Sequence, residues 1–297
     1  MMSGVDHEKM LLSQEKQEKI KEVRRLIGPL SEKASVYCSD SSISRYLRCK
    51  NWNVKKAAQM LQRSLKWREE YKPEEIRWED VANGAETGKI YMANYCDRHG
   101  RTVLVMKPSL QKSTNDVEEQ VKYFVYSIEN AIFNLPPNQE EIVWLIDFQG
   151  YSMASISFKM TREITFILQE YYPEHLGLAI LYNAPRIFRP FYSMVKPLLD
   201  AKTQNRFKFG YSNDHNTKKM MEDLFDMDQL ESVFGGNNDT GFDIVKYAER
   251  MKEQEKKVSS FWTLVKTPSS SLSQTHSASS SDSTSLDPDS DGSNTEN

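Results

Sequence analysis

The sequence lacks several features that would place it in a special class at once. It contains no run of about 18 consecutive apolar residues, the least that would predict a membrane-spanning helix. Its first residues, MMSGVDHEKMLLSQEKQEKIKEV, are too charged for a secretory signal peptide. Cysteine is scarce, and Cys38, Cys49 and Cys96 show neither a CxxC spacing nor a Cys/His pattern. We therefore expect a protein kept in the cytosol, with reduced thiols and no metal site.

Most of the chain also lacks an excess of either positive or negative charge. Residues 259–297 contain one base and five acids, a net charge of −4, whereas the other 258 residues contain 38 bases and 37 acids, a net charge of +1. A body this close to neutral argues against a general nucleic-acid-binding protein. The 14 serines of residues 259–297 and the scarcity of apolar residues there predict a disordered tail, because such a segment buries too little surface to offset its chain entropy.

Phosphate-binding loops and catalytic motifs are missing as well. No GxxxxGK[ST] occurs, and no GxGxxG follows a strand-like run. The closest approach to an esterase motif is Gly150-Tyr151-Ser152-Met153-Ala154, with Asp200 and His215 following in hydrolase order. The next helix is expected to start only near Ser157, too late for a strained one-residue elbow, and no HGGG-like loop precedes it. We therefore expect no enzyme and keep a serine esterase only as a remote alternative.

Helical periodicity dominates the first 75 residues. Residues 8–27 carry apolar positions at helical spacing and end at Gly28-Pro29. Asp40 is a candidate N-cap for the next helix, and Asn53 is a candidate N-cap for the one after it. Pro73 ends this segment. The pattern predicts a small N-terminal helical bundle over residues 1–75.

Strand-like and helical runs alternate from residue 76 to residue 245. This alternation predicts an α/β domain with a mostly parallel sheet and crossover helices, and the turn at residues 99–101 predicts that the first two strands form an edge hairpin. The third segment, residues 246–297, holds the end of a last helix over 241–258, the short apolar patch SSFWTLVK and the tail. The expected strands are 90–95, 102–106, 142–148, 178–182 and 206–209, and the expected helices are 117–133, 158–171, 187–196 and 217–225.

Residues 186–199, RIFRPFYSMVKPLL, carry an apolar stripe at helical spacing, flanked by Arg186, Arg189 and Lys196. An ordinary core helix accounts for such a stripe. The alternative is a helix that packs over a cavity and can expose its aromatic face at a bilayer, with its cations toward anionic headgroups. The residues alone leave both interpretations open. The members of the stripe are Ile187, Phe188, Phe191, Tyr192, Val195, Leu198 and Leu199.

Six motifs follow one another along the chain: DSSISRYLRCKNWNVKKAAQML, LKWREEY, VWLIDFQGYS, EYYPEHLG, YNAP and KPLLD. In this order and spacing they resemble the CRAL-TRIO phospholipid-transfer proteins, in the phosphatidylinositol-transfer-like branch, from Asp40 to Phe234. The resemblance implies a helical bundle beside a β-sheet floor and a pocket that holds one lipid with its acyl chains buried. It also implies a mobile gate helix, matched by residues 186–199. A bound phospholipid is the implied ligand, and no cofactor is implied.

The resemblance further implies which residues bind an inositol headgroup. Glu174 matches the glutamate that accepts hydrogen bonds from inositol hydroxyls, Thr203 matches a threonine after KPLLD, and Arg206 stands where the family has a lysine. Lys50 matches one cation of an Arg-Lys pair, while Asn51 removes the other.

Two further positions bear on a second ligand. Ile142 and Trp144 match the hydroxyl-bearing residues that two-ligand members use for phosphatidylcholine, and neither carries a hydroxyl. Trp144 is expected to fill the space of the choline phosphate. The resemblance therefore implies that an inositol lipid, or another single hydrophobic ligand, binds, and that phosphatidylcholine exchange is weak or lost.

The leading interpretation is a non-enzymatic phospholipid-binding and transfer protein, with phosphatidylinositol as cargo. It is expected to be a cytoplasmic monomer that docks transiently on cytosolic membrane faces. One alternative is a lipid-gated scaffold or sensor that presents a phosphoinositide to a kinase and recruits partners through the Ser-rich tail. Another is a carrier of a different hydrophobic ligand, such as a tocopherol or a retinoid. The expected partners are a membrane surface and a phospholipid, and no nucleic acid.

Overall fold

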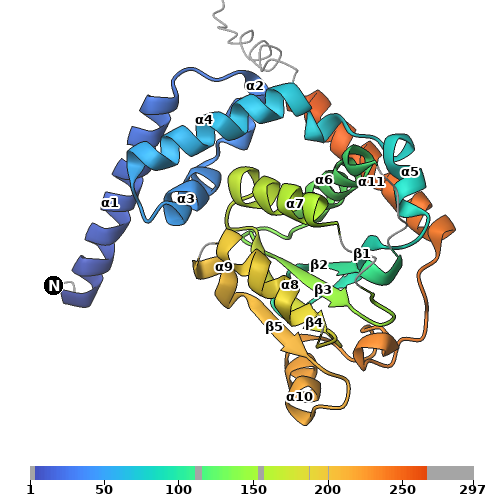
Figure 1. Ribbon diagram of the computed structural model, residues 1–297. Coiled ribbons are helices and arrows are strands. Elements are labelled where there is room, and N and C mark those ends of the chain that lie inside the picture. The colour runs from blue at the N-terminus through green and yellow to red at the C-terminus, as the bar shows by residue number, and fades with distance from the viewer. Residues whose placement is uncertain (1–3, 111–115, 153–156, 187, 200, 266–297) are drawn as a thin grey trace, which may run out of the picture.

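The computed structural model describes residues 4–110, 116–152, 157–186, 188–199 and 201–265. Ile187, Asp200 and residues 266–297 of the tail expected to be disordered lie outside the described residues, and so do the side chains of Phe191, residues 4–11 and residues 264–265. Residues 259–265, which were included in that tail, are helical, so the expectation of disorder is wrong for them. The chain folds into a central sheet with helices around it, and the first helices extend to one side (Figure 1).

The N-terminal helices are α1 (Gly4–Ile27), α2 (Glu32–Tyr37), α3 (Asp40–Cys49) and α4 (Val54–Tyr71). Asn53 caps α4 as expected, since its side chain accepts a hydrogen bond from the Lys56 amide at 3.0 Å. The expectation for Asp40 is wrong: Ser39 is the N-cap of α3, and Asp40 is the first helical residue. A serine hydroxyl and an aspartate serve equally well as caps, so adjacent candidates are hard to rank from sequence.

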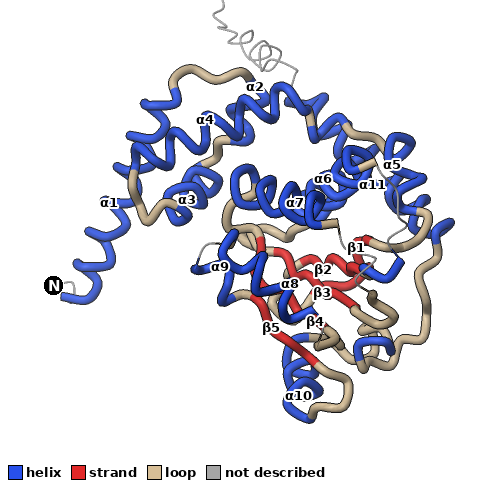
Figure 2. Tube along the Cα trace, in the orientation of Figure 1, coloured by secondary structure: helices blue, strands red, loops and turns tan. Residues whose placement is uncertain are grey.

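The sheet has five strands in the order β1-β2-β3-β4-β5: β1 (Ile90–Cys96), β2 (Thr102–Met106), β3 (Ile142–Asp147), β4 (Leu176–Tyr182) and β5 (Phe207–Gly210). Strands β1 and β2 are antiparallel, and the other neighbours are parallel, so both the expected hairpin and the mostly parallel sheet are confirmed. The strands lie in the middle of the domain with helices around them (Figure 2).

Four helices lie close to where their periodicity placed them: α6 (Val117–Phe133), α7 (Phe158–Tyr171), α8 (Phe188–Val195) and α10 (His215–Leu224). The short helix α9 (Ala201–Asn205) was not expected. The 3₁₀ turns are η1 (Pro73–Glu75), η2 (Pro108–Leu110), η4 (Lys196–Leu198) and η5 (Ser232–Phe234). Helix α7 begins at an N-cap, Ser157, and ends before Pro173. The α/β fold class is therefore confirmed.

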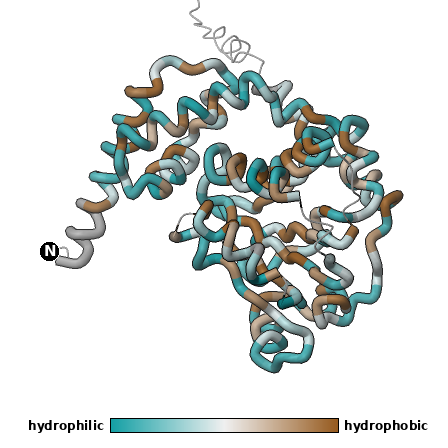
Figure 3. The backbone as a smooth tube through the Cα atoms, in the orientation of Figure 1, coloured by the Kyte–Doolittle hydropathy of each residue, from teal (hydrophilic) through white to brown (hydrophobic). Residues whose placement is uncertain are grey.

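Two clusters of buried apolar residues hold the chain together. One lies among the N-terminal helices and includes Val23, Ile43 and Leu61. The other extends from Ile76 to Met251 and includes every residue of β3 except its terminal aspartate. Figure 3 shows apolar positions recurring along the helices and through the central strands. The predicted boundaries at residues 75 and 245 stay predictions.

Three helices were not expected, and a fourth runs further than expected. Helices α2, α5 (Trp78–Ala85) and α9 are short, so their apolar periodicity does not stand out in the sequence. Helix α11 (Ile244–Val265) includes the residues expected to form a separate apolar patch. It runs on because tertiary contacts hold its last turns: Arg77 donates to the Ser259 hydroxyl at 3.1 Å, and the rings of Phe133 and Phe261 pack 5.9 Å apart.

Among the described residues, no helix has both the length and the apolar character needed to span a bilayer. Within the same ranges, no three side chains of the His, Cys, Asp or Glu types gather as metal ligands. Cys38 is buried, Cys49 is half-buried and Cys96 is exposed, and none of these three described residues forms a disulfide.

Candidate functional site

A cavity lies between the sheet, α7 and α8. The space open to the centre of a water-sized molecule is about 250 Å³. Strand β3 supplies its floor through Ile142, Trp144 and Ile146, which share one face because side chains alternate along a strand. Trp144 also packs edge-on against Phe124 of α6, with the ring centroids 5.8 Å apart. The tryptophan thus lines the cavity, as the sequence placed it.

Helix α7 forms the wall opposite the floor. Met160, Ile164 and Leu168 line the cavity at intervals of four residues, and Thr161 and Thr165 lie on the same side. On the outer side of this helix, Phe158 and Phe166 are 48% and 53% exposed. The inner side of the wall thus combines three large apolar side chains with two threonines, and the outer side of the helix leaves two phenylalanine rings in contact with solvent.

Helix α8 covers the cavity with one face and meets solvent with the other. Phe188, Tyr192, Val195 and Leu199 line the cavity, and the rings of Phe188 and Phe148 pack 4.4 Å apart. The cations Arg189 and Lys196 are exposed. Between the two interpretations of the stripe, the structure favours a helix over a cavity, because its inner residues border empty space as well as core.

Three residues of the stripe need separate statements. Leu198 is 39% exposed and does not line the cavity, because Pro197 turns the chain into η4 and rotates this side chain outward. Ile187 lies outside the described residues, and so does the side chain of Phe191. Met194, which the stripe did not include, is 55% exposed on the outer face of α8.

Glu174 stands where the apolar cavity meets polar groups. Its backbone is left-handed, with φ 62°, a conformation that costs a residue with a β-carbon about 1 kcal/mol. Pro173 precedes it and β4 begins two residues later, so the turn brings the carboxylate to the cavity lining. Strained residues of this kind cluster at functional sites. Glu174 is also the residue that the family resemblance matched to a headgroup-binding glutamate.

Arg206 holds the carboxylate of Glu174 in place. Its Nη2 lies 3.0 Å from Glu174 Oε2 and 3.6 Å from Glu141 Oε1, and its Nη1 donates to the carbonyl of Leu176. Both side chains are largely enclosed, with 20% of Arg206 and 13% of Glu174 exposed. The guanidinium is thus engaged by two carboxylates, and its charge is largely neutralised at this site.

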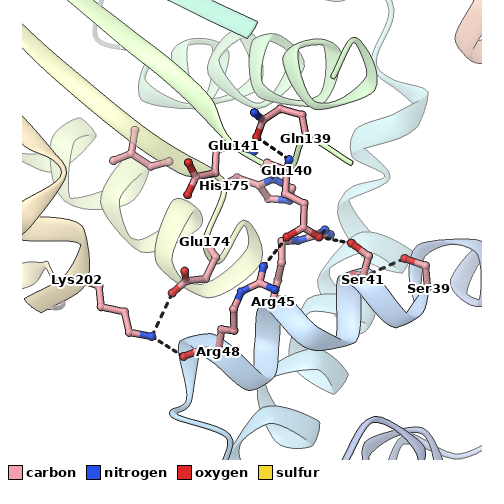
Figure 4. Close-up of polar contacts among 12 residues, drawn as sticks. Ser39, Ser41, Arg45, Arg48, Gln139, Glu140, Glu141, Glu174, His175 and Lys202 are labelled. Atoms are coloured by element: carbon pink, nitrogen blue, oxygen red, sulfur yellow. Dashed lines mark hydrogen bonds and ion pairs between the residues drawn. The ribbon is translucent and has the colours of Figure 1, made fainter. Parts of the chain in front are cut away.

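Lys202 also lies at the cavity mouth, and it was not among the candidates named from the sequence. Its ammonium lies 3.7 Å from Glu174 Oε1 and donates to the carbonyl of Arg48 at 2.7 Å (Figure 4). Thr203, the next residue, lines the cavity. Lys50 is the C-cap of α3, and it does not line the cavity although its neighbour Cys49 does. The hydrogen bond to the Arg48 carbonyl places Lys202 between α9 and the end of α3, a relationship that the sequence does not show.

A cluster of ion pairs fixes α3 against the domain beside this mouth. Arg45 and Arg48 reach Glu140 at 3.0 and 2.5 Å, and the Ser41 hydroxyl donates to the same carboxylate (Figure 4). Burial opposes ionisation, but the hydrogen bond from Ser41 and the charges of both arginines outweigh it and hold the pKa of Glu140 below its ordinary value. Adjacent Glu140 and Glu141 therefore have separate partners.

His175 and Tyr172 form the rear of the cavity. The ring of His175 is buried, and its Nδ1 donates to the Glu140 carbonyl at 2.8 Å. Burial, helped by the charge of Arg45, lowers the pKa of His175 to about 3, so the ring is neutral. The Tyr172 hydroxyl donates to Glu129 at 2.5 Å, and Arg68 pairs with the same carboxylate at 2.8 and 2.9 Å. These contacts fix the segment that carries Glu174.

The esterase alternative finds no assembled site among the described residues. Ser152 does not line the cavity, and α7 starts only at Phe158. His215 is exposed at the start of α10, and Asp200 lies outside the described residues. The arrangement offers an apolar cavity whose lining includes the carboxylate of Glu174 and the guanidinium of Arg206, with the ammonium of Lys202 3.7 Å from Glu174. Such a site can bind an amphipathic molecule with a polar, hydroxyl-bearing end.

Three comparisons with known proteins agree with this geometry. The sequence profile of the CRAL/TRIO domain matches residues 85–236. The chain is 30% identical to a CRAL-TRIO domain-containing protein of Schizosaccharomyces pombe over 75% of its length, and 28% identical to the phosphatidylinositol transfer protein PDR17 of Saccharomyces cerevisiae over 70%. It is 26% identical to the phosphatidylinositol transfer protein CSR1 of Eremothecium gossypii over 69%.

The chain spans 21%, 60% and 48% of these three relatives' lengths, respectively. Among solved structures it resembles that of Sfh5, with a TM-score of 0.62 and 18% sequence identity, over 89% of this chain and 99% of the other. At that identity the likeness concerns the fold alone.

Proposed function

Because the chain belongs to the CRAL/TRIO domain family, we propose that it binds one phospholipid, with phosphatidylinositol as the preferred cargo, and transfers it between membranes without catalysing a reaction. The observation that carries the proposal is the carboxylate of Glu174 at the edge of an apolar cavity that α8 covers. A carboxylate accepts hydrogen bonds from inositol hydroxyls, and the apolar walls accommodate acyl chains. Relatives named as phosphatidylinositol transfer proteins support the choice of lipid.

The energetics require such a cavity. Moving an acyl chain from a bilayer into water costs about 0.8 kcal/mol per methylene group, so a free diacyl lipid is prohibitively unfavourable. A cavity lined by Ile142, Ile164, Leu168 and Phe188 replaces the bilayer contacts. Exchange then needs an opening that forms only at the membrane. In this proposal α8 is the gate.

The cavity floor supports selectivity for the inositol lipid. Trp144 is 6% exposed and fills space beside Ile142, and neither side chain donates a hydroxyl to a choline phosphate. A phosphate buried here would lose its hydrogen bonds to water, and no hydroxyl donor would replace them. We therefore infer that phosphatidylcholine is at most a poor cargo.

The outer face of α8 and η4 is the proposed membrane contact. Met194 and Leu198 are 55% and 39% exposed, and the exposed cations Arg189 and Lys196 lie on the same short segment. Apolar side chains that insert, with cations level with anionic headgroups, give weak and reversible binding to a bilayer surface. The protein would thus act as a monomer that visits cytosolic membrane faces transiently.

The deciding experiment is lipidomics of the purified native chain. We expect one phospholipid per protein in the organic extract, with inositol lipids enriched over their share of the host's lipids. Vesicle assays should then show transfer of phosphatidylinositol well above that of phosphatidylcholine. Recovery of a tocopherol, a retinoid or no lipid at all would overturn the assignment of the cargo.

A scaffold that presents a phosphoinositide to a kinase is the second candidate, and the structure sharpens its test. Truncation at residue 259 would cut α11, where Ser259 and Phe261 contact Arg77 and Phe133. Truncation after Val265 keeps the helix and removes only the Ser-rich tail. Unchanged lipid transfer with lost activity in cells would favour the scaffold.

A further inference from the structure

The cations Arg48, Lys202 and Arg206 lie close to the carboxylates of Glu140 and Glu174 beside the cavity mouth. Two of them are already committed to carboxylates. Arg48 lies 2.5 Å from Glu140, and Arg206 lies 3.0 Å from Glu174 and 3.6 Å from Glu141. A lipid phosphate that bound to either guanidinium would have to displace its carboxylate partner, and a partly buried ion pair is costly to break. These two arginines are therefore better suited to positioning carboxylates than to holding a lipid phosphate.

Lys202 differs from both arginines. Its side chain is 51% exposed, and its ammonium lies 3.7 Å from Glu174 Oε1, beyond hydrogen-bond range. Its hydrogen bond, at 2.7 Å, goes to the Arg48 carbonyl in the last turn of α3. A lysine ammonium has three donors on a flexible stem, so it can keep one partner and turn others toward a ligand.

The side chain of Lys202 reaches across the cavity mouth. It lies on α9, 154 residues along the chain from its partner at the end of α3, and it reaches from that helix terminus toward Glu174 (Figure 4). Both groups it approaches are negative, since the last carbonyls of a helix carry a partial negative charge. These two groups therefore attract the ammonium. An anionic headgroup that enters beside Glu174 would offer it a full negative charge instead.

We propose that Lys202 is a headgroup-binding residue: its ammonium lies at the cavity mouth between Glu174 and α3, and moves to the phosphodiester of an anionic lipid when one binds. The inference rests on the proposed function and assigns a part of it to a residue outside the motifs. It also gives a physical basis for selectivity. The ammonium attracts an anionic phosphodiester whose headgroup bears only hydroxyls, and it repels the quaternary ammonium of choline.

The test uses the full chain, loaded from phosphatidylcholine vesicles that contain a small fraction of phosphatidylinositol, and measures the ratio of the two lipids bound. We expect Lys202→Met to lower the ratio of inositol lipid to choline lipid about tenfold, the effect of one charge-assisted hydrogen bond. Lys202→Arg should restore most of the ratio, because it keeps the charge. Lys218→Met is the control: that lysine is 68% exposed on α10 and pairs only loosely with Glu222, at 3.9 Å.

The outcomes separate the inference from the function it rests on. A wild-type ratio in Lys202→Met, with inositol lipid bound normally by the wild type, overturns the role of Lys202 alone. Failure of the wild-type chain to bind any inositol lipid overturns the proposed function and this inference together. An equal loss of both lipids in Lys202→Met, with no rescue by arginine, would mean that the lysine only supports the fold, and would also overturn the inference.

Discussion

Nδ1 of His175 lies 2.8 Å from the backbone carbonyl of Glu140, the residue whose carboxylate receives Arg45 and Arg48. Through its carbonyl and its carboxylate, Glu140 thus links the rear of the cavity to α3. The histidine, which follows the proposed ligand-binding glutamate directly, is a buried structural group.

This contact predicts a loss of stability in mild acid. The pKa of His175 is lowered by burial from 6.5 to about 3 in the fold, so the unfolded chain binds more protons between these values. The histidine's contribution is full above about pH 6.5 and is lost progressively as the pH falls toward 3. Urea denaturation should give a smaller unfolding free energy at pH 5 than at pH 7.5.

The pH range over which stability is lost distinguishes the histidine from the carboxylates. Glu140, whose pKa is held below 4.5, loses its contribution only at lower pH. In His175→Asn, whose amide can still donate to the Glu140 carbonyl, the difference between pH 7.5 and pH 5 should shrink. A variant with an unchanged pH difference would show that His175 is not the responsible group.

Glu140→Ala tests the attachment of α3. The change leaves Arg45 without its carboxylate, and that side chain is only 13% exposed. Since removing one partner of a largely enclosed ion pair uncovers the desolvation cost of the other, we expect a loss of about 2–4 kcal/mol in unfolding free energy. Glu70→Ala is the control, because its 3.8 Å pair with Lys66 is exposed and should contribute less than about 1 kcal/mol. Equal effects in the two variants would contradict the assignment.

Glu174→Gln tests the headgroup carboxylate with little change of shape. Arg206 keeps Glu141 at 3.6 Å, so stability should change by no more than about 1 kcal/mol. Binding of phosphatidylinositol should fall about tenfold, because an amide oxygen accepts hydroxyl hydrogen bonds less strongly than a carboxylate. Glu163→Gln, at an exposed position of α7, serves as the control in the same vesicle assay. Binding at the wild-type level would remove Glu174 from the site.

Met194→Asp combined with Leu198→Asp tests the membrane contact of α8 and η4. Both side chains are exposed, so melting temperature should hardly change, while charged groups at this surface oppose insertion into a bilayer. Transfer between anionic vesicles should fall at least tenfold, and lipid already bound should remain. Val245→Asp, at an exposed valine of α11, controls for the loss of surface hydrophobicity. A similar fall in that variant would speak against a specific contact through α8.

Local patterns predicted the secondary structure well where they were long and regular. Helices α6 and α7 begin and end at the residues expected from their periodicity, since each has a clear polar or proline boundary. The last turns of α11 were not foreseen, because their helical state depends on contacts with Arg77 and Phe133, which are distant in sequence. Propensity is a weak guide where packing decides.

The sequence by itself determined the fold family, the mostly parallel sheet and its edge hairpin, because motifs and periodicities are local features of the chain. Tertiary structure alone decided which charges remain available at the mouth. Arg206 proved to be held between two carboxylates, and Lys202 proved to reach the end of α3. Electrostatic roles depend on distances between segments far apart in the chain, and those distances exist only once the helices and the sheet have packed.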